Sequence, residues 1–271
     1  MATSFKRVAL AAVAAAGVSA IVPQAAHAQA VALELSLVID VSGSVDTTEY
    51  DLQRGGYQAA FLDATVQANI ASFFPLGGIA VNVIQFATNA EQVINWTQLN
   101  SIADINGFAA TIGAMARNSA GGNSTDVEDG INLAVASLND NLFTGARRVI
   151  DVSGDGHQNT DPSCSGASPY NIACAAVQTA RNTAAAGGIR INGLAIEGDY
   201  GASGLTTWYN TNVRTTDGFV QTATGFDTFE AAVIAKIGRE IIETNVPEPA
   251  SMVLMGAGLL GLGMVRRRRR S

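Results

Sequence analysis

Apolar runs and segments with helical spacing follow one another through the middle of the chain. The apolar runs predict strands at 33–40, 78–87, 90–99, 146–154, 189–198 and 218–223. Apolar residues three or four positions apart predict helices at 47–74, 101–116, 124–140, 171–188, 205–213 and 227–243. Asp46 and Glu49 have the spacing of a capping box at the start of the first helix.

This order of elements predicts the fold class. Strands separated by helices favour an α/β fold with a doubly wound, mostly parallel sheet and helices on both faces. The turn at Thr88 and Asn89 is too short for a crossover, so it predicts an antiparallel pair whose second strand lies at an edge of the sheet. Ligands of such sheets bind beyond the carboxyl ends of the strands, where the strand order reverses.

The N-terminal segment has the three parts of a secretory signal peptide. Two basic residues at 6–7 precede an apolar stretch at 8–22, and small-x-small cleavage sites follow at 26–28 and 28–30. The alternative is a membrane anchor. Because the apolar stretch is short and ends at a proline, we expect a cleaved signal peptide at 1–28.

The C-terminal segment at 246–271 has three parts as well. Val-Pro-Glu-Pro precedes an apolar run at 250–265, and five arginines follow it. The run is shorter than the roughly 20 residues of a spanning helix, and the arginines favour the cytoplasmic side. This tail resembles the PEP-CTERM sorting signals of Gram-negative bacteria. The resemblance implies that an exosortase-type membrane enzyme removes the tail and that the protein reaches the cell surface or an extracellular matrix. A retained membrane anchor is the alternative.

The charge of the remaining chain restricts its partners. Between Val31 and Val246 there are 9 basic and 22 acidic side chains. This excess argues against nucleic acid or an anionic membrane as partner, because both select basic surfaces. The membrane would be met only transiently, through the sorting tail. The length fits one α/β domain with a full core at 31–245.

Cys164 and Cys174 are the only cysteines of the chain. They lie close together in a stretch rich in Ser, Pro, Gly and Asn. In an exported protein, such a pair predicts a disulfide. A metal pair is the alternative, but His157 is the only histidine that would remain nearby.

Three oxygen-bearing side chains follow the first strand. Asp40, Ser42 and Ser44 form a D-x-S-x-S motif, whose spacing lets alternate residues of a loop direct their oxygens at one point. Gly43 permits the tight backbone between them. Oxygen ligands favour a hard cation such as Mg²⁺, Ca²⁺ or Mn²⁺ over zinc. The alternative is a polar turn that caps the next helix.

The motif D-x-S-G-S after a buried strand resembles the metal-ion-dependent adhesion site (MIDAS) of von Willebrand factor A-type domains. In that family two further loops complete the site. The resemblance assigns Thr125, one residue before a predicted helix start at Asp126, and Asp155, in the D-G after the central strand. It extends over nearly the whole mature chain, and it is strongest to a bacterial subfamily of unknown function. It implies one bound divalent cation, Mg²⁺ foremost, with Ca²⁺ or Mn²⁺ as alternatives.

The pentapeptide Ile-Asp-Val-Ser-Gly occurs twice, at 39–43 and at 150–154. In the first copy the aspartate and the serine are expected ligands. After the second copy the expected ligand is Asp155, whereas Asp151 and Ser153 are expected to be structural. Both copies end a buried strand at the same end of the sheet, which explains the shared sequence without a duplication.

Other polar residues near the motif are expected to have minor roles. We expect His157 to be an unligated loop histidine, with contact to a ligand as the alternative. Asp126, Glu128 and Asp129 occupy the first turn of a predicted helix, where acidic side chains stabilise the helix dipole.

These expectations converge on a binding protein rather than an enzyme. In the resembled family, the partner's acidic group fills an open position on the metal. We therefore expect an exported adhesion module that binds a protein or an acidic exopolysaccharide at the cell surface. One rival is a metal-dependent hydrolase, which would need a general base or nucleophile beside the metal. Another is a structural matrix protein whose metal only stiffens the loops.

Overall fold

The computed structural model describes residues 28–118, 121–162, 164, 173–198 and 204–242. These residues form a six-stranded sheet in the order β3-β2-β1-β4-β5-β6. The strands are β1 (Gln29–Asp40), β2 (Ile79–Phe86), β3 (Ala90–Leu99), β4 (Phe143–Gly154), β5 (Ile189–Ile196) and β6 (Val220–Ala223). All neighbours are parallel except β2 and β3. The predicted fold class is confirmed, including the antiparallel strand at an edge.

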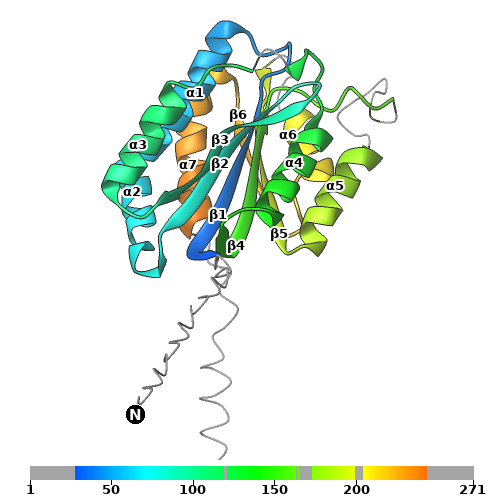
Figure 1. Cartoon of the computed structure of the whole chain (residues 1–271). Coiled ribbons are helices and arrows are strands. Elements are labelled where there is room, and N and C mark those ends of the chain that lie inside the picture. The colour runs from blue at the N-terminus through cyan, green and yellow to red at the C-terminus, as the bar shows by residue number, and fades with distance from the viewer. Residues whose placement is uncertain (1–27, 119–120, 163, 165–172, 199–203, 243–271) are drawn as a thin grey trace, which may run out of the picture.

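Helices cover both faces of the sheet. The α-helices are α1 (Thr47–Leu62), α2 (Ala64–Ala71), α3 (Ile102–Gly113), α4 (Val127–Asn139), α5 (Ala175–Ala186), α6 (Gly204–Asn212) and α7 (Phe229–Ile242). Figure 1 shows α1, α2, α3 and α7 on one face and α4, α5 and α6 on the other. No helix within the described ranges has the length and apolar character needed to cross a membrane.

The sheet separates two apolar cores. Leu37 of β1 and Phe229 of α7 belong to the core under α1, α2, α3 and α7. Val38 of β1 and Trp208 of α6 belong to the core under α4, α5 and α6. Successive side chains of β1 point to opposite faces, so this central strand supplies both cores and is an apolar run rather than an alternating one.

One predicted helix is wrong. The segment predicted as a single helix at 47–74 is two helices, α1 and α2, followed by a short 3-10 helix at Phe74–Leu76. Asp63 separates α1 from α2, because its carboxylate accepts the backbone N–H groups of Thr65 and Val66 at 2.9 and 3.0 Å. This N-cap begins a new helix, although the apolar spacing continues across the break.

The chain extends the sheet from β1 in two directions. It adds β2 and β3 on one side and then β4, β5 and β6 on the other, so the order reverses between β1 and β4. Ile39 is in register with Ser153. The loops after Asp40 and Gly154 therefore leave the sheet side by side, at the position where doubly wound sheets bind ligands.

Candidate metal centre

Asp40 ends β1 and is fully buried at the carboxyl edge of the sheet. The backbone N–H of Ser42 donates to Asp40 Oδ1 at 2.8 Å. The amide of Gln53 on α1 donates to the Asp40 carbonyl oxygen at 3.2 Å, which fixes the end of the strand. Among the described residues, Asp40 Oδ2 is buried and has no hydrogen-bond partner. A buried carboxylate oxygen without a hydrogen-bond partner destabilises the folded state unless a positively charged group lies beside it.

A chain of hydroxyl groups joins the three predicted loops. Thr125 Oγ1 donates to Ser42 Oγ at 3.0 Å, and Ser42 Oγ lies 3.2 Å from Ser44 Oγ. Ser44 Oγ donates to Asp155 Oδ1 at 2.7 Å. The structure thus brings together four side chains from three loops that are far apart in the sequence. Asp40 is linked to them because it accepts the backbone N–H of Ser42.

Backbone contacts hold the loops together. The N–H of Gly43 donates to the Asn123 carbonyl oxygen at 2.8 Å, which joins the first loop to the second. Asn159 joins the second loop to the third, because its Oδ1 accepts the Thr125 N–H at 2.9 Å and its own N–H donates to the Thr125 carbonyl. Neither asparagine was predicted. Both lie in polar loop sequence, where no periodicity distinguishes a residue that links loops.

The site is strongly acidic in character. Burial and, to a lesser extent, the charge of Asp155 raise the pKa of Asp40 to about 7, against the opposing effect of hydrogen bonds from Ser42 and the charge of Arg117. A divalent cation would stabilise the charged form of Asp40 beside the charge of Asp155.

Arg117 is a site residue that the sequence analysis missed. It lies in the loop after α3, and its Nη2 donates to the carbonyl oxygens of Val41 and Ser42 at 2.8 and 2.7 Å. Among the described residues its guanidinium has no carboxylate partner. No sequence signal identifies it, because its contacts are to backbone oxygens about 75 positions away.

The donor set fits a hard cation. It contains two carboxylates and three hydroxyls, and all of the ligand atoms would be oxygens. A Cβ atom at Gly154 would stand 2.8 Å from Asp40 Oδ2, so glycine there keeps the space beside that oxygen open. Within the described ranges no group of three or more His, Cys, Asp and Glu side chains could hold a metal. Any cation at this position therefore depends on the hydroxyls as well as the carboxylates.

The second pentapeptide copy has a different environment. Asp151 is fully buried and forms an ion pair with Lys236 of α7. Ser153 Oγ accepts a hydrogen bond from the Tyr57 hydroxyl at 3.0 Å. Both polar side chains of this copy therefore contact groups inside the core under α1 and α7, away from the hydroxyl chain.

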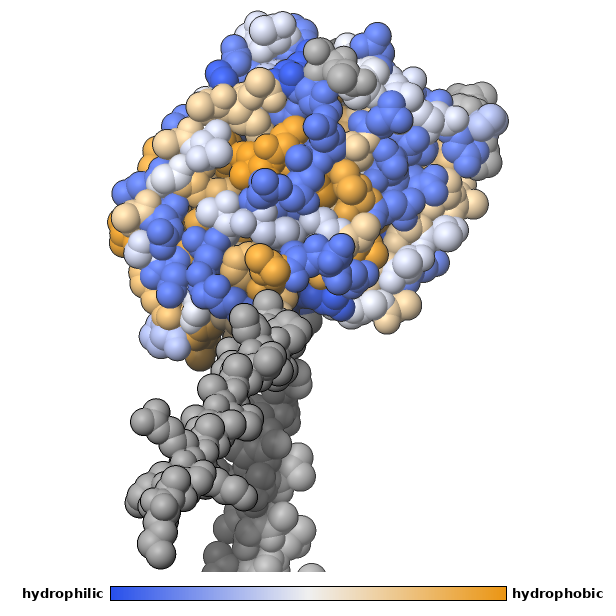
Figure 2. Space-filling view, viewed as in Figure 1, coloured by the Kyte–Doolittle hydropathy of each residue, from blue (hydrophilic) through white to orange (hydrophobic). Residues whose placement is uncertain are grey.

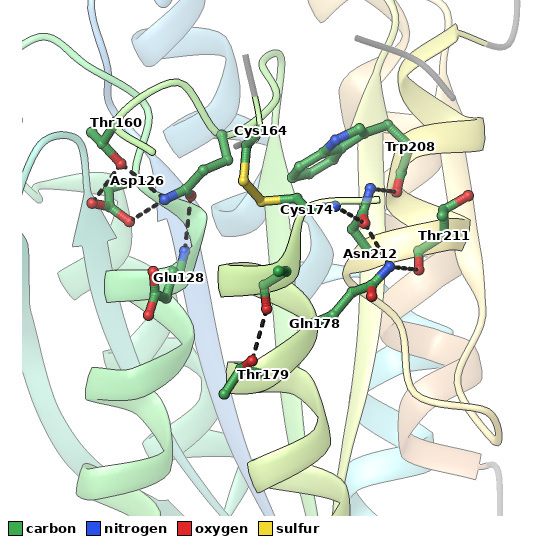
Figure 3. The surroundings of a disulfide bond; sticks show 12 residues. Asp126, Glu128, Thr160, Cys164, Cys174, Gln178, Thr179, Trp208, Thr211 and Asn212 are labelled. Atoms are coloured by element: carbon green, nitrogen blue, oxygen red, sulfur yellow. Dashed lines mark hydrogen bonds between the residues drawn. A yellow bond between two sulfur atoms is a disulfide. The ribbon is translucent and has the colours of Figure 1, made fainter. Parts of the chain in front are cut away.

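The disulfide predicted between Cys164 and Cys174 is present, with the two Cα atoms 4.6 Å apart. Figure 3 shows it at the start of α5, where the Cys174 N–H donates to Asn212 Oδ1 of α6 at 2.8 Å. The bridge therefore fastens the segment after the Asp155 loop to two helices. Residues 165–172, which the disulfide encloses, lie outside the described part of the chain.

Asp126 has the capping role that was expected. It is the N-cap of α4 and accepts the Asp129 N–H at 3.1 Å. It also accepts hydrogen bonds from Gln158 and Thr160, both at 2.8 Å, which ties the start of α4 to the loop after Asp155 (Figure 3). His157 is half-buried in the same loop, and burial lowers its pKa. Its role as an unligated histidine stays a prediction.

Known structures with this architecture identify the class of fold. Proximal thread matrix protein 1 (PTMP1) from the mussel byssus has a TM-score of 0.54 at 15% identity, over 76% of this chain and 47% of that chain. The pilus adhesin SpaC from Lactobacillus rhamnosus GG has a TM-score of 0.55 at 14% identity, over 78% and 31%. A von Willebrand factor type A structure from Catenulispora acidiphila has a TM-score of 0.52 at 12% identity, over 78% and 43%. The fold is therefore of the von Willebrand factor A type, and the chain spans less than half the length of each of these structures.

Family models match the sequence in two places. A family model described as a protein of unknown function (DUF1194) matches residues 30–245, and the chain belongs to this family. A PEP-CTERM protein-sorting motif matches residues 245–270, which marks an exported protein sorted to the cell surface. No curated protein sequence matches the chain. A further mussel PTMP1 structure is described as having a zinc-occupied MIDAS motif, with a TM-score of 0.51 at 16% identity over 77% and 48%.

Proposed function

We propose that the protein is a surface-associated binding module that uses a divalent cation to engage an acidic group on a partner. The ligands of the cation are Asp40, Ser42, Ser44, Thr125 and Asp155. The observation that carries this proposal is the buried Oδ2 of Asp40, which has no hydrogen-bond partner among the described residues and lies beside a chain of three hydroxyls.

Each residue has a distinct part in this site. Asp40 and Asp155 supply the negative charge, and the hydroxyls of Ser42, Ser44 and Thr125 supply neutral oxygens. When bound, the cation supplies positive charge that a carboxylate of the partner can neutralise. Mg²⁺ is the expected ion, and Ca²⁺ or Mn²⁺ are alternatives, because all of them prefer oxygen ligands. Water and the partner's acidic group complete the coordination shell.

The comparisons support a binding role in a general way. PTMP1 is a matrix protein and SpaC is a pilus adhesin, and another PTMP1 structure is described with a metal in its MIDAS motif. We propose that this chain acts without catalysis, with a mature domain at 31–245. The tail at 246–271 would be removed by an exosortase-type enzyme, and the partner would be a protein or an acidic exopolysaccharide at the cell surface.

Retention on the host's extracted surface matrix tests the proposal. The exported protein should be retained in Mg²⁺ and released by EDTA. Asp40→Ala should be released in both conditions while its far-ultraviolet circular dichroism stays native. Asp140→Ala is the matched control, because Asp140 is an exposed carboxylate at the end of α4. Equal retention of wild type and Asp40→Ala in Mg²⁺ would contradict the proposed function.

A further inference from the structure

A groove runs along the edge of the sheet between β3 and α3. Its volume is 740 Å³, and we call it the β3–α3 groove. Its walls are residues 91–94 of β3, then Ala110, Thr111 and Ala114 on the α3 side, and residues 115–118 of the loop that follows. Figure 2 shows hydrophobic surface beside β3, bounded by hydrophilic residues.

One wall of the groove is an edge strand. β3 ends the strand order, so β2 is its only strand neighbour in the described part of the sheet. Alternate backbone N–H and C=O groups of an edge strand point away from the sheet and can pair with an added strand. An extended peptide uses these groups when it binds by strand addition, and its side chains then supply specificity.

The opposite wall leaves room for such a strand. Ala110 on α3 and Ala114, the C-cap of α3, are exposed, and their small side chains leave space between this helix and β3. Val93 is half-buried and adds apolar surface that a strand's side chain could cover, whereas Met115 is buried in the core beneath the groove. The Glu91 carboxylate accepts a hydrogen bond from the Asn118 amide at 2.8 Å, so it has a partner already.

Arg117 connects the groove to the metal centre. Its side chain lines the groove, and its Nη2 contacts the carbonyl oxygens of Val41 and Ser42 in the first metal loop. Only Nη2 is engaged within the described structure. The charge of Arg117 acts on Asp40, but its other guanidinium donors make no hydrogen bond within the described structure, and they are complementary to an acidic group.

We propose that the β3–α3 groove binds an extended acidic segment of a partner protein, which pairs with β3 and places a carboxylate between Arg117 and the cation. This inference rests on the proposed function. Of the two partner classes proposed there, it selects a protein rather than a polysaccharide. The edge strand favours a peptide over a polysaccharide, because its outward backbone groups can pair with another peptide backbone, although the register between β2 and β3 shifts near Gln92 and Ile94. Arg117 then determines specificity, because its guanidinium attracts an acidic residue at one end of the segment.

The probe is a phage-displayed library of short linear peptides, selected on the exported protein in Mg²⁺. We expect enriched peptides to carry an acidic residue at one end and to bind in a fluorescence-anisotropy assay. Ala114→Trp, which fills the groove, should weaken binding at least tenfold. Ala103→Trp is the matched control, because Ala103 is exposed on the same helix outside the groove. Arg117→Gln should weaken binding several-fold and reduce its salt dependence, and Arg117→Lys should restore part of both.

The thermal shift caused by Mg²⁺ alone is measured on every variant, so that the two proposals fail separately. The inference is supported if Ala114→Trp loses peptide binding but keeps the Mg²⁺ shift, and if Arg117→Gln weakens peptide binding in Mg²⁺. It is overturned if no peptide is enriched, or if Ala114→Trp binds the peptides as wild type does. It is also overturned if polyglucuronate binds, is blocked by Ala114→Trp, and no peptide competes with it. Peptide binding that needs no cation would overturn the placement of the carboxylate beside the cation, whereas a wild-type protein without a Mg²⁺ shift would contradict the proposed metal function.

Discussion

The ammonium group of Lys236 on α7 forms an ion pair with the carboxylate of Asp151 on β4, and both side chains are fully buried. Lys236 Nζ also lies 2.6 Å from Glu240 Oε1, one helical turn further along α7. The amide of Asn192 on β5 donates to the same oxygen at 2.9 Å. This buried cluster fastens the last helix to the middle of the sheet, and it gives Asp151 a partner that Asp40 does not have.

Asp151→Ala should destabilise the protein strongly. Removing one partner of a buried ion pair leaves an uncompensated charge, which costs about 3–5 kcal/mol. Glu240 remains beside Lys236, so we expect the lower end of that range. Urea unfolding of wild type and variant measures the loss. In Asp151→Ala/Lys236→Met, which removes both partners, much of the stability should return. A single variant as stable as wild type would show that the pair has no structural role.

The pH dependence of the free energy of unfolding should reflect the ionisation of Glu240. Burial raises the pKa of Glu240 to about 8, the charge of Asp151 acts in the same direction, and Lys236 opposes it. The folded state therefore keeps a proton that the unfolded state loses near pH 4.5. The free energy of unfolding should fall as the pH rises from about 4.5 to about 8. In Glu240→Gln this fall should be smaller, as urea titrations across that range would show. An identical slope in both proteins would contradict the assignment.

The sequence was sufficient to predict the sheet and the meeting of the loops, for a physical reason. Apolar runs such as 33–40 specify buried strands, and the motif at Asp40 lies at a strand end, where the topology alone determines its neighbours. The burial of Lys236 could not be predicted, because a lysine four residues before a glutamate on a helix has the pattern of a surface ion pair. Its burial depends on Asp151, which approaches from another element. The role of Arg117 could not be predicted either, because it contacts backbone carbonyl oxygens, which every residue type has.

Loss of the disulfide should destabilise the fold without removing the metal site. Cys164 and Cys174 are 10 positions apart, and closing a loop of this size is worth about 3 kcal/mol in the chain-entropy model. Cys164→Ser/Cys174→Ser should therefore unfold at lower urea concentration than the oxidised wild type. Non-reducing peptide mapping of periplasmic protein should find the linked pair. Equal midpoints for the oxidised protein and the double variant would contradict a stabilising bridge.

The sorting motif predicts a shortened C-terminus in the native host. The motif at 245–270 ends in arginines that should remain with the membrane when the tail is cleaved. Intact-mass measurement of surface-extracted protein should show a product that ends near Pro247. As a control, the same chain expressed in a host without an exosortase should keep its full C-terminus. Surface protein from the native host that retains all five arginines would contradict processing.

The central claim is that the first pentapeptide copy and Asp155 bind a cation, whereas the second copy does not. With two carboxylates among the ligands, the affinity should be modest, with Kd on the order of 10⁻⁴ to 10⁻³ M, as in extracellular modules. Binding to the native state should raise stability by about 2.7 kcal/mol at a hundredfold excess of cation over Kd. Asp40 and Asp155 should both be needed for this increment, whereas Asp151 should not.

The direct measurement is a melting series with Mg²⁺, Mn²⁺ and Ca²⁺ on wild type, Asp40→Ala, Asp155→Ala and Asp151→Ala, each against EDTA. The cation should raise the melting temperature of wild type, and Asp151→Ala should show the same increment from a lower starting value. Asp40→Ala and Asp155→Ala should show none. A wild-type melt that no cation shifts would contradict the account, as would an increment that Asp151→Ala loses and Asp155→Ala keeps.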